Sequence, residues 1–209
     1  MLPRNLTARL GVIVGLLNLG FMAMAQGEPF TSTNRPAIKS ELRPGETVGD
    51  HQIQRAYVRF GTNLFVFVVP DGFTLNAADP EKIILSNPEG DCFITLRLAR
   101  QTVQDPAADL KFCRETALQR FPGAELSTEF EEFALNRSGP AFDLKWRIGG
   151  AEQLARIIFI SSPAGLLEFS LVTTPKKFST GRRILVSVMA GLQSGPESTI
   201  VTTPALGCS

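Results

Sequence analysis

Several residue types that build catalytic and metal sites are scarce in this chain of 209 residues. It has one histidine, His51, and three cysteines, Cys92, Cys113 and Cys208, which lie far apart and form no C-x-x-C pair. Histidine is the side chain whose ordinary pKa suits a general base near neutral pH, and no apolar pattern surrounds His51 to hold it beside a nucleophile. We therefore expect no Ser-His-Asp or Cys-His catalytic site, no metal site and no cofactor.

Long apolar runs are limited to one, from Leu10 to Met22. It follows the basic residues Arg4 and Arg9 and ends in the small-x-small triplet Ala23-Met24-Ala25. This three-part layout is typical of a secretory signal peptide, and the run is too short to span a membrane comfortably. We predict a signal peptide over residues 1–25, a periplasmic or secreted mature protein, and no transmembrane segment after cleavage.

An excess of charge of either sign is absent too. Removal of the predicted leader would leave 19 of the 21 basic residues against 20 acidic residues. A nearly neutral chain has no overall field that would attract nucleic acid. We expect no nucleic-acid partner, and instead an envelope or extracellular protein.

The remaining residues divide into one domain with two extensions. Residues 26–51 are rich in proline, glycine, serine, threonine and charge, which predicts a flexible linker. The serine, glycine, threonine and proline residues of 194–209 predict a flexible tail. Residues 52–193 contain the strand and helix patterns, and the 15 phenylalanines of the chain can fill a core.

Strand patterns dominate this domain. Cys92, Ile94, Leu96 and Leu98 alternate with polar or aromatic residues, and Phe142, Leu144, Trp146 and Ile148 do the same. Residues 156–160 and 166–172 flank a turn at 161–165, which predicts a hairpin. The apolar residues of 126–135 change phase between Phe130 and Phe133, which predicts a β-bulge there.

Two segments have the helical period instead. The first begins at Asp105-Pro106 and ends before Pro122, with Leu110, Cys113, Ala117 and Phe121 on one face. The second begins at Thr174-Pro175 and runs to about residue 192. Its predicted buried stripe consists of Phe178, Leu185, Val188, Met189 and Leu192. The order of elements predicts an α+β fold, an antiparallel β-sheet with helices packed on it.

Short motifs in this order resemble those of the PsbP-like domains. They are Val69-Pro70-Asp71-Gly72-Phe73, the helix over residues 105–121, and the hairpin that leads to Thr174-Pro175-Lys176-Lys177-Phe178. The resemblance covers about residues 57–193 and implies an α-β-α sandwich with an accessory or binding role and no enzymatic activity. It transfers no catalytic residues, and the metal-binding histidines of some plant members are missing here. A photosystem role is therefore not implied.

The cysteines offer one candidate site. Cys92 is expected on the covered face of its strand and Cys113 on the inner stripe of the following helix, so the two form a candidate disulfide in an oxidising compartment. The alternative is two separate buried thiols that act as small apolar residues. Cys208 would then be a thiol in the tail.

Two clusters of charge offer alternative functions. Lys176, Lys177, Arg182 and Arg183, at the start of the last helix, form a candidate patch for an anionic surface, or else an ordinary solvated face. Glu129, Glu131 and Glu132 are candidate carboxylates for a hydrolase, or else a solvated strand edge. The leading hypothesis from the sequence is an exported, non-enzymatic accessory domain that binds an envelope protein or a small ligand.

Overall fold

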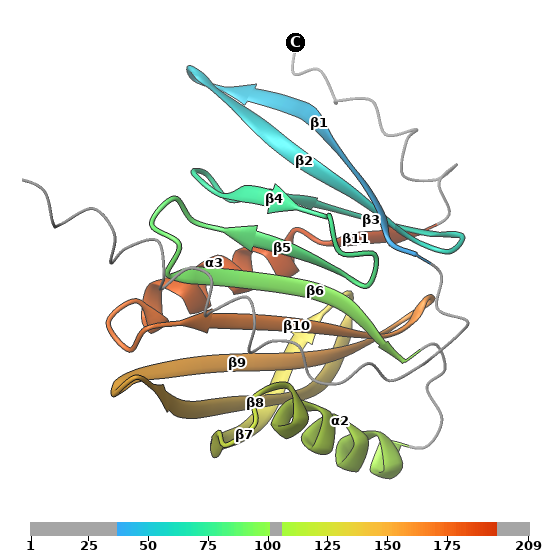
Figure 1. Cartoon of the computed structure of the whole chain (residues 1–209). Helices are drawn as coiled ribbons and strands as arrows, with labels where there is room; N and C mark the ends of the chain where they lie inside the picture. Colours follow the sequence, from blue (N-terminus) through green and yellow to red (C-terminus); the bar gives the residue numbers. More distant parts are fainter. Residues whose placement is uncertain (1–36, 101–105, 196–209) are drawn as a thin grey trace, which may run out of the picture.

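A computed structural model describes residues 37–100 and 106–195 of the chain, which form two antiparallel sheets and two helices (Figure 1). The seven-stranded sheet has the order β4-β5-β6-β10-β9-β8-β7, and the four-stranded sheet has the order β1-β2-β3-β11. The predicted antiparallel α+β class is confirmed, although one sheet was expected and two are present. The strands are β1 (Lys39–Val48), β2 (His51–Phe60), β3 (Asn63–Val68), β4 (Thr74–Asn76), β5 (Lys82–Ser86), β6 (Cys92–Arg100), β7 (Glu125–Ala134), β8 (Arg137–Ile148), β9 (Ala151–Ser162), β10 (Gly165–Thr173) and β11 (Gln193–Gly195). The helices are α2 (Pro106–Arg120) and α3 (Phe178–Ala190).

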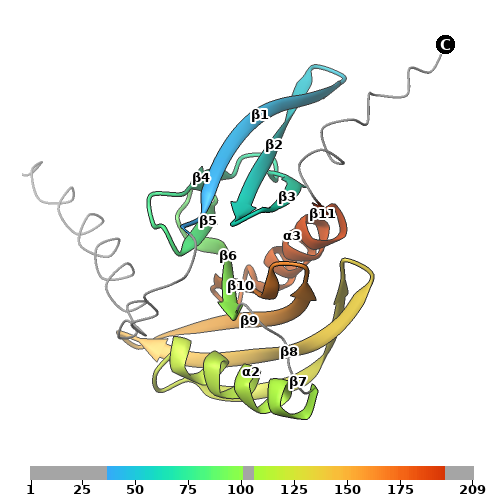
Figure 2. The same ribbon diagram turned by 90° about the vertical axis from the view of Figure 1, so that its right-hand side faces the viewer.

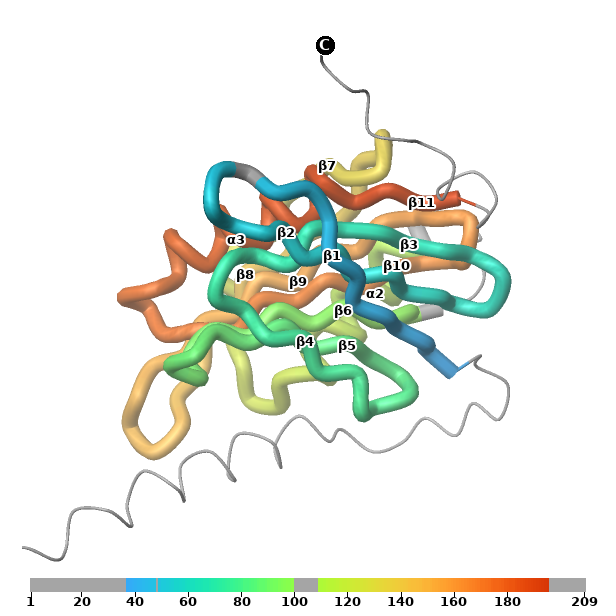
Figure 3. Tube along the Cα trace, turned by 90° about the horizontal axis from the view of Figure 1, so that it is seen from above, coloured from blue at the N-terminus to red at the C-terminus, as the bar shows by residue number. Residues whose placement is uncertain are grey.

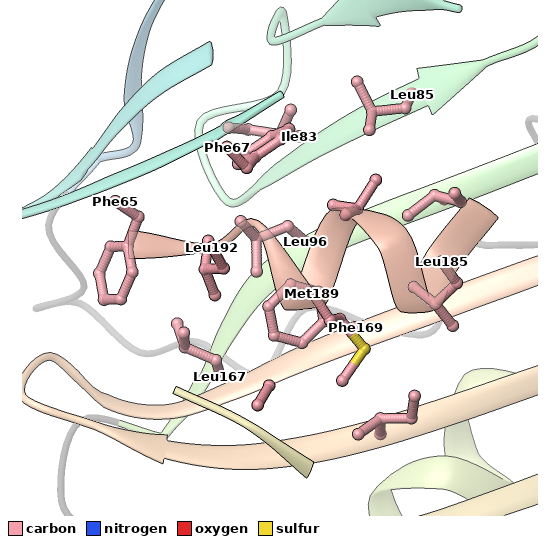
Figure 4. Packing of buried hydrophobic residues seen from close by; sticks show 14 of the residues in the cluster. Phe65, Phe67, Ile83, Leu85, Leu96, Leu167, Phe169, Leu185, Met189 and Leu192 are labelled. Carbon is pink, nitrogen blue, oxygen red and sulfur yellow. The ribbon is translucent and has the colours of Figure 1, made fainter. Parts of the chain in front are cut away.

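The larger hydrophobic cluster lies between the two sheets and α3. The four-stranded sheet contributes Phe65 and Phe67, α3 contributes Leu185 and Met189, and the central strand β10 contributes Phe169 among others. Figure 4 shows these side chains interdigitating around α3. The predicted stripe of the last helix is confirmed at its centre, because Leu185, Val188 and Met189 are all buried.

A second cluster covers the opposite face of the seven-stranded sheet. Along β9, Ile158 and Ile160 belong to the first cluster, whereas Ile157 and Phe159 belong to the second, as the alternation of side chains in a strand requires. α2 packs on this second face, so the two helices lie on opposite sides of β8, β9 and β10 (Figure 2).

The contact stripe of α2 is made of small side chains. Cys113 and Ala117, one turn apart, are fully buried, whereas Leu110, which the helical period placed on the same inner stripe, is exposed. The prediction for Leu110 is therefore wrong. Small residues let a helix axis approach the sheet closely, and the larger leucine then projects outward from the side of the helix.

No disulfide joins Cys92 and Cys113. Both residues are buried as expected, but Cys92 belongs to the cluster under α3 and Cys113 to the cluster under α2, on opposite faces of the sheet. The candidate disulfide is therefore wrong, and the alternative of two separate buried thiols fits. Burial raises the pKa of the Cys92 thiol, with the nearby Asp91 carboxylate acting in the same direction.

The predicted linker over residues 26–51 is wrong where the structure describes it. Residues 39–48 form β1, which pairs with β2 from Lys39 opposite Arg59 to Val48 opposite His51. The domain therefore begins before residue 52, and β11 extends it to Gly195, beyond the predicted boundary at 193. The predicted signal peptide, most of the predicted tail and Cys208 lie outside the described residues.

The hairpin of β9 and β10 is confirmed, with Gly165 paired to Ser162 across the turn. The bulge predicted between Phe130 and Phe133 is misplaced: the register of β7 against β8 shifts between Leu126 and Thr128 instead. The phase change has another cause, since Phe130 is half-buried on one face and Phe133 is exposed on the other.

Candidate functional site

The interior offers no room for a ligand in the cavity that the structure shows. This cavity, of about 10 Å³, lies between the two sheets and α3. Its volume is about that of one water molecule, and an apolar lining gives a water no hydrogen-bond partner. Its lining residues are Phe67, Ile83, Leu85, Ile94, Leu96, Phe169 and Val188.

The outer part of the hairpin of β1 and β2 is poorly buried. Of the nine β1 residues whose side chains the structure describes, none is buried, and the first five residues of β2 are exposed or half-buried as well. The hairpin rises from the rest of the molecule with its turn at the far end (Figures 1 and 2), and it overlies the other strands when seen from above (Figure 3). We call residues 39–55 the arm, and Tyr57 lies at its base, opposite Glu41.

The arm is tied together by charged and aromatic side chains. Arg43 donates two hydrogen bonds to Glu41, at 3.0 and 2.8 Å, and its guanidinium lies 4.5 Å from the centre of the Tyr57 ring. Arg55 pairs with Glu46 at 3.1 Å across the hairpin. The hydrogen bond from Arg43 holds the pKa of Glu41 below its ordinary value. These contacts give one face of the hairpin a charged surface, while the exposed side chain of Leu42 lies on the other face.

One of the four cations of the candidate anionic-surface patch is already paired with acidic neighbours. Lys177 donates a hydrogen bond to Asp91 at 3.0 Å and lies 3.9 Å from Glu89, and these contacts raise its pKa. This pair fastens the start of α3 to the turn before β6. Lys176, Arg182 and Arg183 remain exposed, with Arg182 placed over the Phe178 ring and Arg183 close to the Thr180 hydroxyl. Three of the four cations therefore belong to the exposed side of the start of α3.

The candidate hydrolase carboxylates each have a partner that fixes them. Glu129 accepts hydrogen bonds from Arg114, at 2.6 and 2.9 Å, and Glu131 accepts one from the Ser138 hydroxyl at 2.7 Å. Glu132 points to the other face of β7, where it lies 3.7 Å from Arg156. Glu132 therefore cannot pair with the other two, and Glu129 and Glu131, which share a face, are each bound to a different neighbour.

Arg156 is the centre of a buried charged cluster beneath α3. It makes two hydrogen bonds to Asp143, at 2.7 and 2.8 Å, and its guanidinium lies 4.3 Å from the Phe130 ring centre. On the opposite face, Glu168 of β10 lies between Arg97 of β6 and Arg120 of α2. Burial lowers the pKa of Arg97, which the Glu168 charge partly offsets. Both clusters join secondary-structure elements, and neither faces a cavity.

Other kinds of site are not found among the described residues. Within residues 37–100 and 106–195, no group of three or more histidine, cysteine, aspartate or glutamate side chains is placed to hold a metal ion. His51 is the exposed first residue of β2, at the tip of the arm. Neither described helix is long and apolar enough to cross a membrane.

The sequence analysis missed the arm as a surface. One feature of the sequence could have indicated it: Tyr57, the single tyrosine of the chain, lies between Arg55 and Arg59, two residues from each. The partner residue Arg43 lay in the predicted linker, so the cross-strand contact was not anticipated.

Comparison with known proteins gives similarity of fold. No protein-family model and no curated protein match the chain. The crystal structure of LpqN, described as involved in cell envelope biogenesis of Mycobacterium tuberculosis, is 17% identical over 74% of this chain and 100% of its own, with a TM-score of 0.46. The solution structure of cyanobacterial PsbP from Synechocystis sp. PCC 6803 is 12% identical over 79% of this chain and 97% of its own, with a TM-score of 0.44.

A protein of unknown function from Pseudomonas aeruginosa is also similar, at 16% identity over 68% of this chain and 92% of its own, with a TM-score of 0.39. The structures that this chain is similar to thus include a PsbP and a cell-envelope protein.

Proposed function

We propose that this chain is an exported, non-enzymatic domain that binds another protein of the cell envelope, and that the arm is its contact surface. The observation that carries the proposal is that β1, a strand of ten residues, buries none of its described side chains. The α-β-α arrangement of a PsbP-like domain belongs to the same proposal, with α2 and α3 on opposite faces of the larger sheet.

The energetics of the arm favour a role outside the fold. Burial of apolar surface, at about 25 cal/mol per Å², is the main source of strand stability, and an isolated two-stranded hairpin is at best marginally stable in water. β1 contributes little such burial to the domain. A partner that covered Leu42 would supply it.

The composition of the arm also suits a protein interface. Interfaces combine an apolar centre with a polar rim and are enriched in tyrosine and arginine. Glu41, Arg43 and Tyr57 lie together on one face of the hairpin, and the exposed Leu42 lies on the other face, so apolar and charged groups occur within a few residues.

Export rests on the leader over residues 1–25, which would place the mature protein in the periplasm or outside the cell. The absence of catalytic activity is supported by the different partners that hold the three candidate carboxylates, Glu129, Glu131 and Glu132, and by the small apolar cavity.

A site-specific photo-crosslinking experiment tests the arm. A photoreactive phenylalanine analogue replaces Leu42 in one variant of the full chain and Val186 of α3 in a control variant. The two positions are matched, since both are apolar and their exposed fractions are 46% and 43%. We expect irradiation in the native envelope to attach one protein species to position 42 and not to position 186.

Affinity measurements then separate the arm from other surfaces. With the crosslinked protein purified as the probe, Leu42→Asp is expected to weaken binding about tenfold or more, because an apolar interface centre is worth at least about 1–2 kcal/mol. Val186→Asp should leave binding within about twofold. Equal labelling at both positions, or equal affinities of the two variants, contradicts the proposal.

A further inference from the structure

A second surface, independent of the arm, lies at one edge of the seven-stranded sheet. β7 is the edge strand of that sheet, and among the described strands β8 alone hydrogen-bonds to it. The outward N–H and C=O groups of an edge strand form a template for another strand.

The other three sheet edges of the described chain are protected. β4 and β11 have three residues each, which is too short to template a strand. β1 contains Pro44 and a register shift between Pro44 and Thr47, and both devices prevent strand addition. β7 contains no proline, and from Thr128 to Ala134 it keeps an unbroken register of seven residues.

The β7 edge is acidic after its own ion pairs are counted. Four carboxylates belong to β7 and a fifth, Asp143, to β8, whereas three cations contact them. The carboxylates of β7 are Glu125, Glu129, Glu131 and Glu132, and the contacting cations are Lys145, Arg114 and Arg156. Glu131 is the carboxylate that a neutral group, the Ser138 hydroxyl, satisfies.

This excess selects the kind of strand that can pair. A second copy of β7 would bring its own carboxylates opposite these, and like charges on facing strands are destabilising. The lysine or arginine side chains of an added strand would instead face the carboxylates of β7, and opposite charges on facing strands are stabilising.

We propose that β7 is a docking edge for an extended, lysine- or arginine-bearing segment of another protein, which adds to the sheet as an eighth strand. Main-chain hydrogen bonds provide affinity in this mode, and alternate side chains provide specificity. Glu129, Glu131 and Phe133 alternate with Phe130, Glu132 and Ala134, so they share the α2 side of the sheet. Phe133, which is 63% exposed, would pack against an apolar residue of the added strand.

The test uses the full chain and a defined probe, a fluorescein-labelled peptide of ten residues in which lysine alternates with threonine and valine. A peptide with glutamate in place of lysine is its control. Fluorescence anisotropy measures binding, and hydrogen exchange with mass spectrometry identifies the backbone amides that the peptide protects. We expect binding of the lysine peptide alone, with protection concentrated in residues 125–134.

A matched pair of charge reversals locates the site. Glu131→Lys should weaken binding about three- to fivefold, the upper part of the range that an exposed charge pair allows. Glu81→Lys, at an exposed carboxylate beside β5 near the opposite edge of the same sheet, should leave it within about twofold. Circular dichroism verifies that both variants fold.

The proposal is overturned by equal effects of the two reversals, by binding of the glutamate peptide, by failure of the lysine peptide to protect β7, or by a dimer of the free protein with β7 protected. Leu42→Asp in the arm should leave the peptide titration unchanged, so failure at either surface does not affect the conclusion at the other.

Discussion

The charge of Glu168 is expected to be a large contributor to the stability of this domain. The Glu168 side chain is 1% exposed, and its carboxylate lies 3.2–3.3 Å from the nitrogens of Arg120 and 3.4 Å from Nε of Arg97. At an effective dielectric constant of about 20, each charge pair has a gross attraction of about 5 kcal/mol. Most of that attraction offsets the cost of removing the carboxylate from water.

Replacement of Glu168 by glutamine removes the attraction and leaves two arginines facing each other. Loss of one partner from a buried ion pair typically costs about 3–5 kcal/mol. Arg97 and Arg120 keep 14% and 24% of their side-chain surface exposed, so each can turn partly towards water. We therefore expect Glu168→Gln to lower the free energy of unfolding by about 3 kcal/mol, at the lower end of that range.

Urea denaturation followed by tryptophan fluorescence measures this change, and a double-mutant cycle assigns it. Arg120→Met alone should cost about 1 kcal/mol, because Arg97 still neutralises Glu168. In the Arg120→Met background, Glu168→Gln should cost at least about 1 kcal/mol less than in the parent protein. A single-variant effect below about 0.5 kcal/mol, or strict additivity, would refute the reasoning.

Three further expectations concern the ends of elements. Burial would raise the pKa of Asp91, but hydrogen bonds from Asn87 and Lys177 outweigh it and hold the pKa below its ordinary value. The ionised Asp91 therefore stabilises the fold above about pH 4, and this stabilisation is lost as pH falls through the folded-state pKa. In thermal melts, the melting temperature of Asp91→Asn should fall less at acid pH than that of the parent protein. A Cβ on Gly139 would overlap the carbonyl oxygen of Phe159, so Gly139→Ala should cost at least about 2 kcal/mol in urea denaturation, and a neutral result would contradict the packing. Asn136 has a φ of 59° in the β7–β8 turn, so Asn136→Gly should raise the free energy of unfolding and Asn136→Ala should lower it, by about 1 kcal/mol or less in each case in urea denaturation.

The predictable part of the fold is the part that buries side chains in a regular pattern. Phe142 and Leu144 of β8 are fully buried, as their alternation with polar residues indicated. The boundaries of α2 agree with the prediction within a residue, because Asp105-Pro106 and Pro122 mark them chemically. β1 escaped prediction for the converse reason: a strand that buries nothing has no need of apolar residues at every second position.

The candidate sites could not be judged from the sequence where they depended on which distant segments of the chain lie together. The sequence shows that Cys92 shares a face with Ile94, but it does not show which face of the sheet the next helix covers. α2 crosses to the face opposite Cys92, and the predicted disulfide depended on the other choice. Likewise Lys177 is held by Asp91, which is 86 positions away, so the sequence did not show that the Lys177 charge is already paired.

The two long edges of this protein are guarded in different ways, and the difference makes a prediction about salt. Proline and a bulge in β1 exclude any added strand at all salt concentrations, because they act on the backbone. Along the unbroken register of β7 from Thr128 to Ala134, the carboxylates exclude a second copy through charge. Between about 0.1 M and about 1 M salt the screening length falls from about 10 Å to about 3 Å. The lysine peptide should therefore bind more weakly at the higher concentration, while self-association of the protein, measured by sedimentation, should increase. Peptide binding that ignores salt would show that the charges of β7 do not select its partner.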